Sequence, residues 1–502
     1  MRAIVYIIGL LVISLPTVSP SIGQESNPSQ RDERSSQRAG KQKRPQGDIP
    51  EIALPPDVAA LDRLSLVLGR PTDKSVTVSI LSADKLEGYC EYGPASGTFT
   101  RKTGLAGFTP DKPTETLLDQ LPPGKPCFYR LRYRKPGSDT FAKGAEHSFH
   151  TQRTPGSTFT FEIQGDSHPE RAKQFDATLY AQTLRAAAAD QPDFYMTIGD
   201  DFSVDTLRTV NAETVAQRYR LQRPFLTLVA QSSPLFLVND NHEQAAACNL
   251  DGTSNNVAVW AQTARNHFFP QPAPDGFYTG DATAVPFIGP LRDYYAWTWG
   301  DALFVVIDPY WHSQKPVDNV FGGGPKTRDK WAITIGDEQY KWLKKTLESS
   351  KARYKFVFAH HVLGTGRGGI EQADLCEWGG KDRKGTDEFT QRRPSWELPI
   401  HPLMAKNGVT IFFQGHDHLF ARQQLDGVVY QTLPDPADPA YALNNKEAYH
   451  SGDLLPNSGR VRVTISPTKV RVEYIRSYLP GDATKEHPDN EIAFAYKIPF
   501  HP

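Results

Sequence analysis

The sequence predicts a multidomain α/β (α+β) protein, in which an all-β sandwich is followed by a layered α/β domain. Between about residues 60 and 152, short segments alternate apolar and polar residues and are separated by glycine and proline, a pattern typical of sandwich strands. From about residue 157, apolar strands alternate with helical segments, which indicates a layered α/β domain. The last part of the chain is rich in strands again and predicts a second sheet.

The sandwich is predicted from five short strands with period-two alternation. In chain order these are SVTVSIL, GYCEYG, TETLLDQL, PCFYRLRYR and EHSFHT. The stretch LLDQLPPGKPCFYRLRYR resembles the late strands of fibronectin type III-like domains, where a leucine and a Pro-Gly turn precede a strand that carries tyrosine. We therefore expect a fibronectin type III-like sandwich over residues 51–154, with residues 151–155 as the hinge.

The α/β domain is predicted over residues 155–502. Its expected strands are FTFEIQGD, FYMTIGD, PLFLVND, ALFVVID and KFVFAHH, followed by the β-rich segments VTIFFQGHDH, VVYQTL, VRVTIS and KVRVEYIRS. Its expected helices are RAKQFDATLYAQTLRAAAA, AETVAQRYRLQRPFLTLV and DEQYKWLKKTLESS, which are long enough to cover the faces of a sheet. The alternation of strand and helix places the helices in layers outside the strands.

The first residues have the order of a secretory signal peptide. Met1 and Arg2 give a positive start, residues 21–23 are small, and the apolar run between them is IVYIIGLLVISL. An uncleaved membrane anchor is the alternative, but this run is short for a bilayer span of about 20 residues. We therefore predict a signal peptide over residues 1–23 and a secreted or periplasmic protein. Residues 24–50 contain few apolar residues and are predicted to be a disordered linker.

The charge of the chain excludes one class of partner. Lys and Arg total 56 against 57 Asp and Glu, which gives a formal net charge of -1. Because no overall basic field exists, we expect no nucleic-acid-binding surface, and any anion must be recognised locally. After the first residues, no other stretch is apolar enough to cross a membrane.

The four cysteines permit one disulfide in each predicted domain. Cys90 and Cys127 fall in the sandwich, whereas Cys248 and Cys376 fall in the α/β domain. Export would favour two such disulfides. Four buried thiols are an equally open alternative, because the sequence does not give the distance between Cβ atoms.

Five of the predicted strands end at side chains that can bind metal ions. Ligands of open α/β sheets bind just beyond the carboxyl ends of the strands, so we expect these side chains to meet at one rim of the sheet. In chain order the groups are Asp166-Ser167-His168, Asp200-Asp201, Asn241-His242-Glu243, His360-His361 and His416-Asp417-His418.

Each group has an ordinary structural explanation when it is taken alone. Asp166 could cap a turn, and His360-His361 could be core or surface histidines. His416 and His418 are more informative, since a spacing of two after a strand points both rings to one side. Five groups in order, each after a strand, favour a site for two divalent metal ions, which clamp the attacking and leaving oxygens of a phosphoester. Mixed His, Asp and Asn ligands suit Zn, Mn, Fe or Mg, and the nucleophile would be a metal-bound hydroxide.

At these residues the sequence resembles the calcineurin-like metallophosphoesterase superfamily, whose motifs are D-x-H, G-D, G-N-H-[DE], a lone H after a strand, and G-H-x-H. The resemblance covers about residues 157–480 and is closest to purple acid phosphatases and alkaline phosphatase D-type enzymes, in which a fibronectin type III-like domain commonly comes first. It implies a four-layer αββα domain. It also implies that His242 is a catalytic residue rather than a ligand, and that two ions are held by Asp166, His168 and His418 on one side, by Asn241, His360 and His416 on the other, and by Asp200 as the bridge.

Three positions depart from the family pattern. Asp240 replaces the usual glycine before Asn-His and leans toward the acidic motif of alkaline phosphatase D-type enzymes. Ser203 stands where purple acid phosphatases carry a tyrosine ligand, so a phenolate-iron colour is not expected unless Tyr195 or Tyr310 takes that role. Val362 replaces the proline after the ligand histidine. There are two weaker candidates for the site. Arg367 could reach a substrate phosphate, although a solvent-exposed loop arginine is its simpler interpretation, and the pair Trp311-His312 could line the site.

The predicted signal peptide and the resemblance together imply an exported enzyme that hydrolyses small phosphate monoesters by attack of a metal-bound hydroxide. A phosphodiesterase of the alkaline phosphatase D type is one alternative. A hydrolase of nucleotides or sugar nucleotides is another. A third is a non-catalytic surface-binding protein with a phosphatase fold, but the complete ligand set argues against it.

Overall fold

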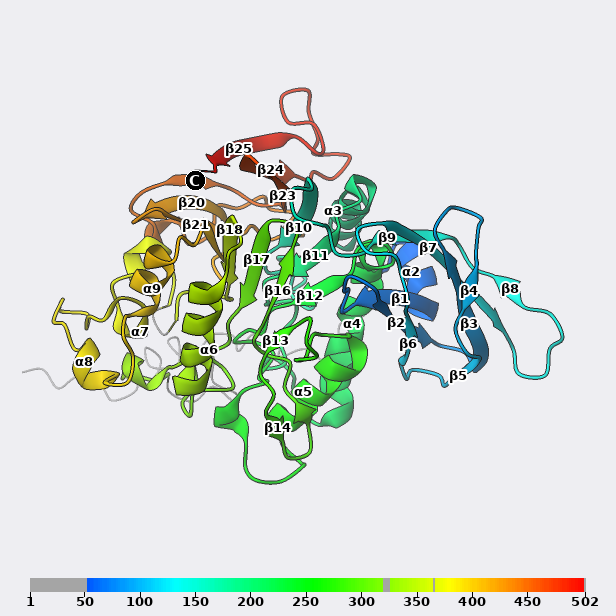
Figure 1. Cartoon of the computed structure of the whole chain (residues 1–502), viewed down its shortest axis with the longest axis horizontal. Coiled ribbons are helices and arrows are strands. Elements are labelled where there is room, and N and C mark those ends of the chain that lie inside the picture. Colours follow the sequence, from blue (N-terminus) through cyan, green and yellow to red (C-terminus); the bar gives the residue numbers. More distant parts are fainter. Residues whose placement is uncertain (1–51, 319–325, 364–365, 501–502) are drawn as a thin grey trace, which may run out of the picture. The chain divides into compact units, whose positions relative to one another are not determined.

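The computed structural model describes residues 52–318, 326–363 and 366–500. The predicted signal peptide (1–23) and linker (24–50) lie outside the described residues. The described residues belong to one compact unit and form a β-sandwich followed by a layered α/β part, which confirms the predicted fold class (Figure 1). The domain boundary at residue 154 stays a prediction.

The N-terminal part contains two antiparallel sheets. One sheet has the order β1-β2-β6, and the other is built on β4-β3-β7-β8, with β5 paired to β3 and β9 paired to β7. The side chains between them, among them Val78, Tyr92 and Leu131, form a buried core. The strands are β1 (Leu64–Gly69), β2 (Val76–Ser82), β3 (Leu86–Gly93), β4 (Arg101–Lys102), β5 (Ala106–Phe108), β6 (Thr114–Leu118), β7 (Pro126–Arg134), β8 (Ala142–Lys143) and β9 (His147–His150).

The first sheet of the α/β part has the order β12-β11-β10-β23-β24-β25. Its first three strands are parallel, as expected for strands joined through helices, and the last three are antiparallel. The strands are β10 (Phe159–Gln164), β11 (Phe194–Thr197), β12 (Leu235–Leu237), β23 (Gly459–Ser466), β24 (Lys469–Arg476) and β25 (Ile492–Pro499). The last three strands of the chain, β23 to β25, therefore extend the first sheet.

The second sheet has the order β13-β16-β17-β18-β19-β21-β20-β22, with parallel pairing from β17 through β18 and β19 to β21. A short hairpin of β14 and β15 lies between β13 and β16 in the sequence. The strands are β13 (Thr279–Gly280), β14 (Ala284–Val285), β15 (Gly289–Pro290), β16 (Tyr295–Trp299), β17 (Ala302–Val306), β18 (Tyr354–Phe358), β19 (Ile411–Gln414), β20 (Phe420–Leu425), β21 (Val428–Thr432) and β22 (Asp453–Leu455).

The two sheets and their helices make four layers. Aromatic and branched side chains from both sheets, including Phe161, Phe194, Phe304 and Phe413, fill the space between the sheets. The outer face of the first sheet packs against α3 (Ala177–Asp190), α4 (Ala212–Ala230) and α5 (Val257–Phe268). The outer face of the second sheet packs against α6 (Gly336–Ser349), α7 (Cys376–Gly379) and α9 (Ile400–Lys406), and α8 (Phe389–Arg392) lies beside α7. This is the expected αββα arrangement.

Helix α3 begins later than the sequence pattern suggests. A helix was expected from Arg171, but α3 starts at Ala177, where the side chain of Asp176 accepts hydrogen bonds from the backbone N–H groups of Thr178 and Leu179. The residues before Asp176 form a loop instead. Because α3 starts later, this loop directly follows the group Asp166-Ser167-His168 at the end of β10.

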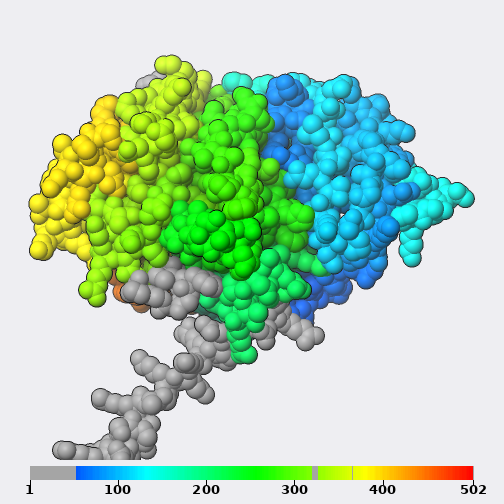
Figure 2. All heavy atoms as spheres, turned by 90° about the horizontal axis from the view of Figure 1, so that it is seen from below, coloured from blue at the N-terminus to red at the C-terminus, as the bar shows by residue number. Residues whose placement is uncertain are grey.

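The sandwich packs directly on the helices of the first sheet. Helix α2 (Pro56–Arg63) contributes Val58 to the core of α3, α4 and α5. The buried Arg223 of α4 donates to Ser65 Oγ at 2.9 Å and to the carbonyl oxygen of Ser79 at 2.8 Å. In the space-filling view the blue and cyan surface of the sandwich meets the green surface without a gap (Figure 2). The two parts therefore share buried contacts.

The four cysteines, all of them in the described residues, carry free thiols, so of the two open alternatives the structure has the one without disulfides. Cys90 lies opposite Leu131 in the β3–β7 register, four residues along the strand from Cys127. At about 3.3 Å per residue this separation far exceeds the reach of a disulfide. Cys248 and Cys376 pack in different apolar clusters. Among the residues that the structure describes, no helix has the length and apolar character needed to cross a membrane.

Candidate metal centre

The five side-chain groups predicted from strand ends come together, but on two sheets rather than one. Those at Asp166, Asp200 and Asn241 follow β10, β11 and β12 of the first sheet. Those at His360 and His416 follow β18 and β19 of the second sheet. The expectation of a single sheet rim is therefore wrong. The apolar inner faces of both sheets pack together, so the carboxyl ends of both sets of parallel strands border one site.

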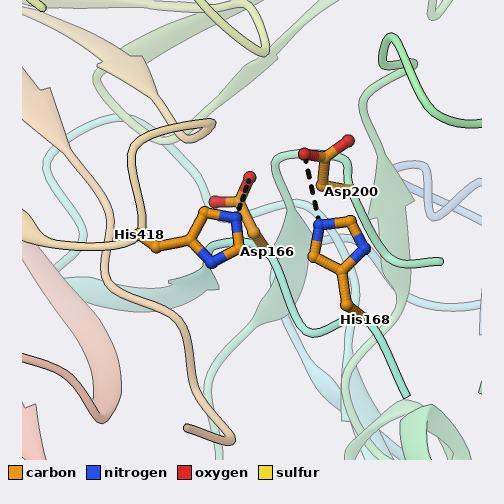
Figure 3. A group of neighbouring side chains, drawn as sticks. All are labelled: Asp166, His168, Asp200 and His418. Carbon is orange, nitrogen blue, oxygen red and sulfur yellow. Dashed lines mark ion pairs between the residues drawn. The ribbon is translucent and has the colours of Figure 1, made fainter. Parts of the chain in front are cut away.

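One group of donor atoms is formed by Asp166, His168, Asp200 and His418, which are fully or almost fully buried. Figure 3 shows the two imidazole rings and the two carboxylates turned toward a common space. His168 Nε2 lies 3.3 Å from Asp200 Oδ2, and His418 Nε2 lies 3.9 Å from Asp166 Oδ1. One atom from each side chain lies within 4.8 Å of the others, a spacing that suits ligands around one ion.

A second group is formed by Asp200, His360 and His416. His360 Nε2 lies 3.4 Å from Asp200 Oδ2 and 3.9 Å from Asp166 Oδ1. Asp200 thus belongs to both groups. A carboxylate shared by two ligand sets is the arrangement that a bridge between two metal ions requires.

Asn241 supplies a further buried donor. Its side-chain amide makes no hydrogen bond through either Oδ1 or Nδ2, although the residue is only 4% exposed. Asp200 Oδ1, His168 Nε2 and His360 Nε2 are also buried without a hydrogen-bond partner. Unsatisfied buried polar atoms cost about 1–3 kcal/mol each, so their concentration here needs a ligand to explain it. Carboxylate, imidazole and amide donors fit a pair of divalent ions.

The backbone at the site is strained. His168, Asp200, His416 and His418 all have positive φ, with values of 41°, 51°, 71° and 53°. Such conformations cost about 1–3 kcal/mol each for residues with a side chain and cluster at functional sites. Gly199 is required for a different reason, because a Cβ there would lie 2.6 Å from the Cβ of Asp240.

Asp240 holds two of the ligand-bearing turns together. Its Oδ2 accepts a hydrogen bond from the backbone N–H of Asp200 at 2.6 Å. Its Oδ1 accepts from the backbone N–H groups of His242 and Glu243 at 2.7 and 2.8 Å. Burial raises the pKa of Asp240 well above its usual range, and the charges of Glu243 and Asp200 add to this effect. The carboxylate that replaces the family's glycine therefore has a structural role.

Second hydrogen bonds fix the orientation of the ligand imidazoles. His360 Nδ1 donates to the carbonyl oxygen of Ile198 at 2.9 Å, which leaves Nε2 to face Asp200. His168 Nδ1 lies 3.3 Å from both Ser203 Oγ and Glu170 Oε1. Ser203 therefore contacts the ring nitrogen opposite the one that faces Asp200.

His242 is held beside the shared carboxylate. Its Nδ1 donates to Asp205 Oδ1 at 2.8 Å, and its Nε2 lies 3.8 Å from Asp200 Oδ2. The guanidinium of Arg171 donates to the same Nε2 at 3.0 Å and to Ser203 Oγ at 2.9 Å. The carboxylate of Asp205 sets the tautomer of His242, so its Nε2 faces the site.

The charges at the centre oppose the effect of burial. Burial alone would raise the pKa of the Asp200 carboxyl, but the imidazoles of His242 and His360, together with that of His168, hold this pKa well below its usual range. Burial acts to lower the pKa of His360, yet Asp200 raises it to about 9. Burial lowers the pKa of His418 to about 4. Asp200 is thus a strong attractor of positive charge at the middle of the site.

Sequence reasoning missed Glu170, Arg171, Asp205 and Asp318. His416 Nε2 lies 3.6 Å from Asp318 Oδ2, a contact that no motif indicated. Glu170 and Arg171 follow the D-x-H motif directly, so their position was the one available signal. Nothing in the sequence pointed to Asp205 or Asp318, which lie in loops.

Of the weaker candidates from the sequence, some lie beside the centre and others do not. Arg367 donates to the carbonyl oxygen of His416 and to Asp417 Oδ1 at 3.0 Å, and therefore lies beside the centre. Tyr195 donates to Gln164 and is directed away from it. The buried hydroxyl of Tyr310 has no hydrogen-bond partner, and its ring centroid lies 6.3 Å from that of His361.

Trp311 and His312 do not join the centre. Trp311 donates to Gln262 Oε1 at 3.0 Å, and His312 contacts Asp293. His361, the neighbour of the chosen ligand His360, has its ring centroid 4.7 Å from that of His416. Of these two adjacent histidines, His360 is the one that approaches Asp200.

Solved structures with a similar fold include PhoD and a purple acid phosphatase. PhoD matches with a TM-score of 0.63 and 14% sequence identity, over 90% of this chain and 92% of that chain. Purple acid phosphatase PPD1 from yellow lupin (Lupinus luteus) seeds matches with a TM-score of 0.56 and 17% identity, over 86% of this chain and 74% of that chain. No family model and no curated protein matches the sequence. The expected resemblance to the calcineurin-like metallophosphoesterases is confirmed at the level of the fold.

Proposed function

We propose that this chain, which has the fold of the calcineurin-like metallophosphoesterases, is an exported metal-dependent phosphoesterase that hydrolyses small phosphate monoesters. The observation that carries the proposal is the position of Asp200, whose carboxylate belongs to both buried donor groups. A purely structural cluster would not need one carboxylate shared between two sets of imidazoles. The strained backbone at Asp200 supports the same interpretation.

The ligand roles follow from the two donor groups. Asp166, His168 and His418 would hold one ion, Asn241, His360 and His416 the other, and Asp200 both. The amide of Asn241 supports its inclusion, because the side chain is buried and makes no hydrogen bond. When bound, a pair of divalent ions supplies Lewis acidity and an activated water molecule for phosphoester hydrolysis.

The chain's own residues would orient the substrate and handle its charge. Arg171 donates to His242 Nε2, so its guanidinium lies where it can bind phosphoryl oxygens. Arg367, whose side chain is 44% exposed, lies beside His416 and could form a second contact with the phosphoryl group. Two arginines favour the doubly charged phosphate of a monoester over the singly charged phosphate of a diester.

His242 is proposed as the group that manages the proton of the leaving oxygen. Asp205 accepts a hydrogen bond from the Nδ1–H group, which stabilises the imidazolium form and points Nε2 toward Asp200. A phosphoryl group that takes up the hydrogen bond of Arg171 would leave Nε2 facing the ester oxygen. A proton held at Nε2 could then pass to the departing alcohol.

The experiment is a comparison of two substrates with metal analysis of the same preparation. We expect the metal-loaded protein to hydrolyse p-nitrophenyl phosphate faster than bis-p-nitrophenyl phosphate. A preference for the diester would assign a phosphodiesterase of the alkaline phosphatase D type. Two bound ions with no turnover of either substrate would favour a non-catalytic protein or a hydrolase of other anhydrides and esters. Export is tested separately by the N-terminal sequence of the mature protein.

A further inference from the structure

A second set of metal-capable side chains lies at another edge of the second sheet. Asp281 directly follows β13, and Asp293 lies two residues before β16, the strand that pairs with β13 through Gly280 and Tyr295. His312 lies in the turn after β17, the next strand of the sheet. Strands β13, β16 and β17 are neighbours in the second sheet (Figure 1), so their ends bring these residues to one place.

The donor atoms of the three side chains are close together. One atom from each of Asp281, Asp293 and His312 lies within 4.8 Å of the others. His312 Nε2 lies 3.0 Å from Asp293 Oδ2. Asp293 is 1% exposed, and its other oxygen, Oδ1, is buried without any hydrogen-bond partner. Asp281 is 3% exposed and accepts a hydrogen bond from the N–H of Thr283 at 2.7 Å.

The cluster has more negative than positive charge. The buried Asp308 lies nearby, but both of its oxygens are already used, by the N–H of Trp311 at 3.0 Å and by Asn239 Nδ2 at 2.9 Å. Among the described residues, the carboxylates of Asp281, Asp293 and Asp308 make one ion pair, between Asp293 and His312. Burial raises the pKa of Asp308 to about 7, and the charge of Asp293 adds to the rise.

Three buried carboxylates around one imidazole are costly unless a cation compensates them. An Asp293–His312 ion pair with a turn at Asp281 would be the simpler explanation. It leaves Asp293 Oδ1 unsatisfied and two carboxylates uncompensated.

We propose that Asp281, Asp293 and His312 form a further metal site, separate from the dinuclear centre, that binds Zn²⁺ or Mn²⁺. Two carboxylates and one imidazole are ligands for borderline divalent ions, whereas Ca²⁺ prefers an all-oxygen set. The side chain of His312 is 20% exposed, so solvent can reach the site and complete the coordination. Asp308 adds charge behind the ligands without binding the ion.

An ion at this site would cross-link the segment after β13 to the turn after β17 through its ligands. It also borders the dinuclear centre indirectly, because Asp308 accepts from Asn239, two residues before Asn241. An ion here would therefore stabilise the loop arrangement from which Asn241 is presented. We assign it a structural role, since none of its ligands contacts the dinuclear ligands within hydrogen-bonding distance.

The test uses the full chain, stripped with a chelator and dialysed against micromolar Zn²⁺, with zinc per chain measured by mass spectrometry. His312→Gln and Asp281→Asn remove one ligand each. The asparagine in Asp281→Asn can still accept from Thr283, so this variant keeps the turn if His312→Gln does not fold. Asp275→Asn is the matched control, because Asp275 caps an exposed turn in the same region and belongs to no cluster.

We expect both ligand variants to bind one Zn²⁺ ion fewer per chain than the wild type, and the control to bind the same amount. Equal zinc in the wild type and in a folded ligand variant would overturn the inference. The difference is independent of the proposed function. If the dinuclear centre did not bind metal, the total would fall in every protein, yet the loss on changing Asp281 or His312 would remain.

Discussion

Replacing Asp240 by glycine would restore the residue usual in the family motif, and we expect it to destabilise the protein. The carboxylate accepts three backbone hydrogen bonds, from Asp200 on one side and from His242 and Glu243 on the other, at 2.6 to 2.8 Å. The loops after β11 and β12 are joined through these bonds. Glycine offers no acceptor to any of the three N–H groups.

The magnitude follows from the number of bonds. A hydrogen bond contributes about 1 kcal/mol net, and a glycine adds about 0.5–1 kcal/mol of backbone entropy in the unfolded chain. Asp240→Gly should therefore lower the free energy of unfolding by about 3–5 kcal/mol. Asp240→Asn keeps one oxygen for His242 and Glu243 but turns an N–H toward that of Asp200, so it should cost about 1–3 kcal/mol.

Urea unfolding of the metal-free protein, followed by tryptophan fluorescence, measures both changes without a contribution from bound ions. Asp275→Gly is the control, because this carboxylate accepts two backbone hydrogen bonds in an exposed turn where water can replace it. The control should lose only about 0.5–1 kcal/mol, the backbone entropy that the added glycine gives to the unfolded chain. If Asp240→Gly lay within about 0.5 kcal/mol of the wild type, or if the asparagine variant lost as much as the glycine variant, the hydrogen-bond argument would fail.

Four further predictions follow from the same structure. Asp200→Asn should lower the metal content of both positions, and a variant that kept both ions and full turnover would remove the bridging role. His242→Ala should keep its metal and lose about 10²–10⁴-fold in kcat, with Asp205→Asn losing less; loss of metal would make His242 a ligand instead. Ser203 stands in place of a tyrosine ligand and contacts Nδ1 of His168, the ring nitrogen that does not face Asp200. Without a phenolate ligand, the iron-loaded protein should be colourless, with an activity optimum near neutral pH or above. A purple protein bleached by Tyr310→Phe would assign a phenolate ligand to Tyr310. Burial lowers the pKa of His147 from its usual 6.5 to about 4, so the stability that goes with the neutral ring is complete above pH 6.5. Up to about 3 kcal/mol of this stability is lost as the pH falls toward 4. His147→Gln should flatten that part of the pH profile of urea unfolding.

Local patterns were sufficient to predict most strands and the identity of the ligand candidates. Alternating segments such as PCFYRLRYR became β7, and apolar runs such as KFVFAHH became β18 with His360 just beyond it. A strand places the residues after its carboxyl end at the rim of its sheet. The order of Asp166, Asp200, Asn241, His360 and His416 along the chain therefore predicted their meeting before any contact was known.

The surroundings of these ligands were not predictable from local patterns. Asp205 reaches His242 from a loop, and Asp318 approaches His416 from another, with no motif to mark either. The sequence left disulfides and free thiols open, because strand register, which separates Cys90 from Cys127, is not encoded in spacing alone.

The sequence by itself determined the types of element and the candidate ligand side chains, because strand periodicity and short motifs act over a few neighbouring residues. Only the tertiary structure decided that two sheets, not one, border the centre. Likewise, only the packing of distant segments joined Asp240 to the turn at Asp200, and Asp281 and Asp293 to His312. The physical reason is that such contacts depend on how the apolar faces of whole sheets pack, and this is settled by side chains far apart in the chain.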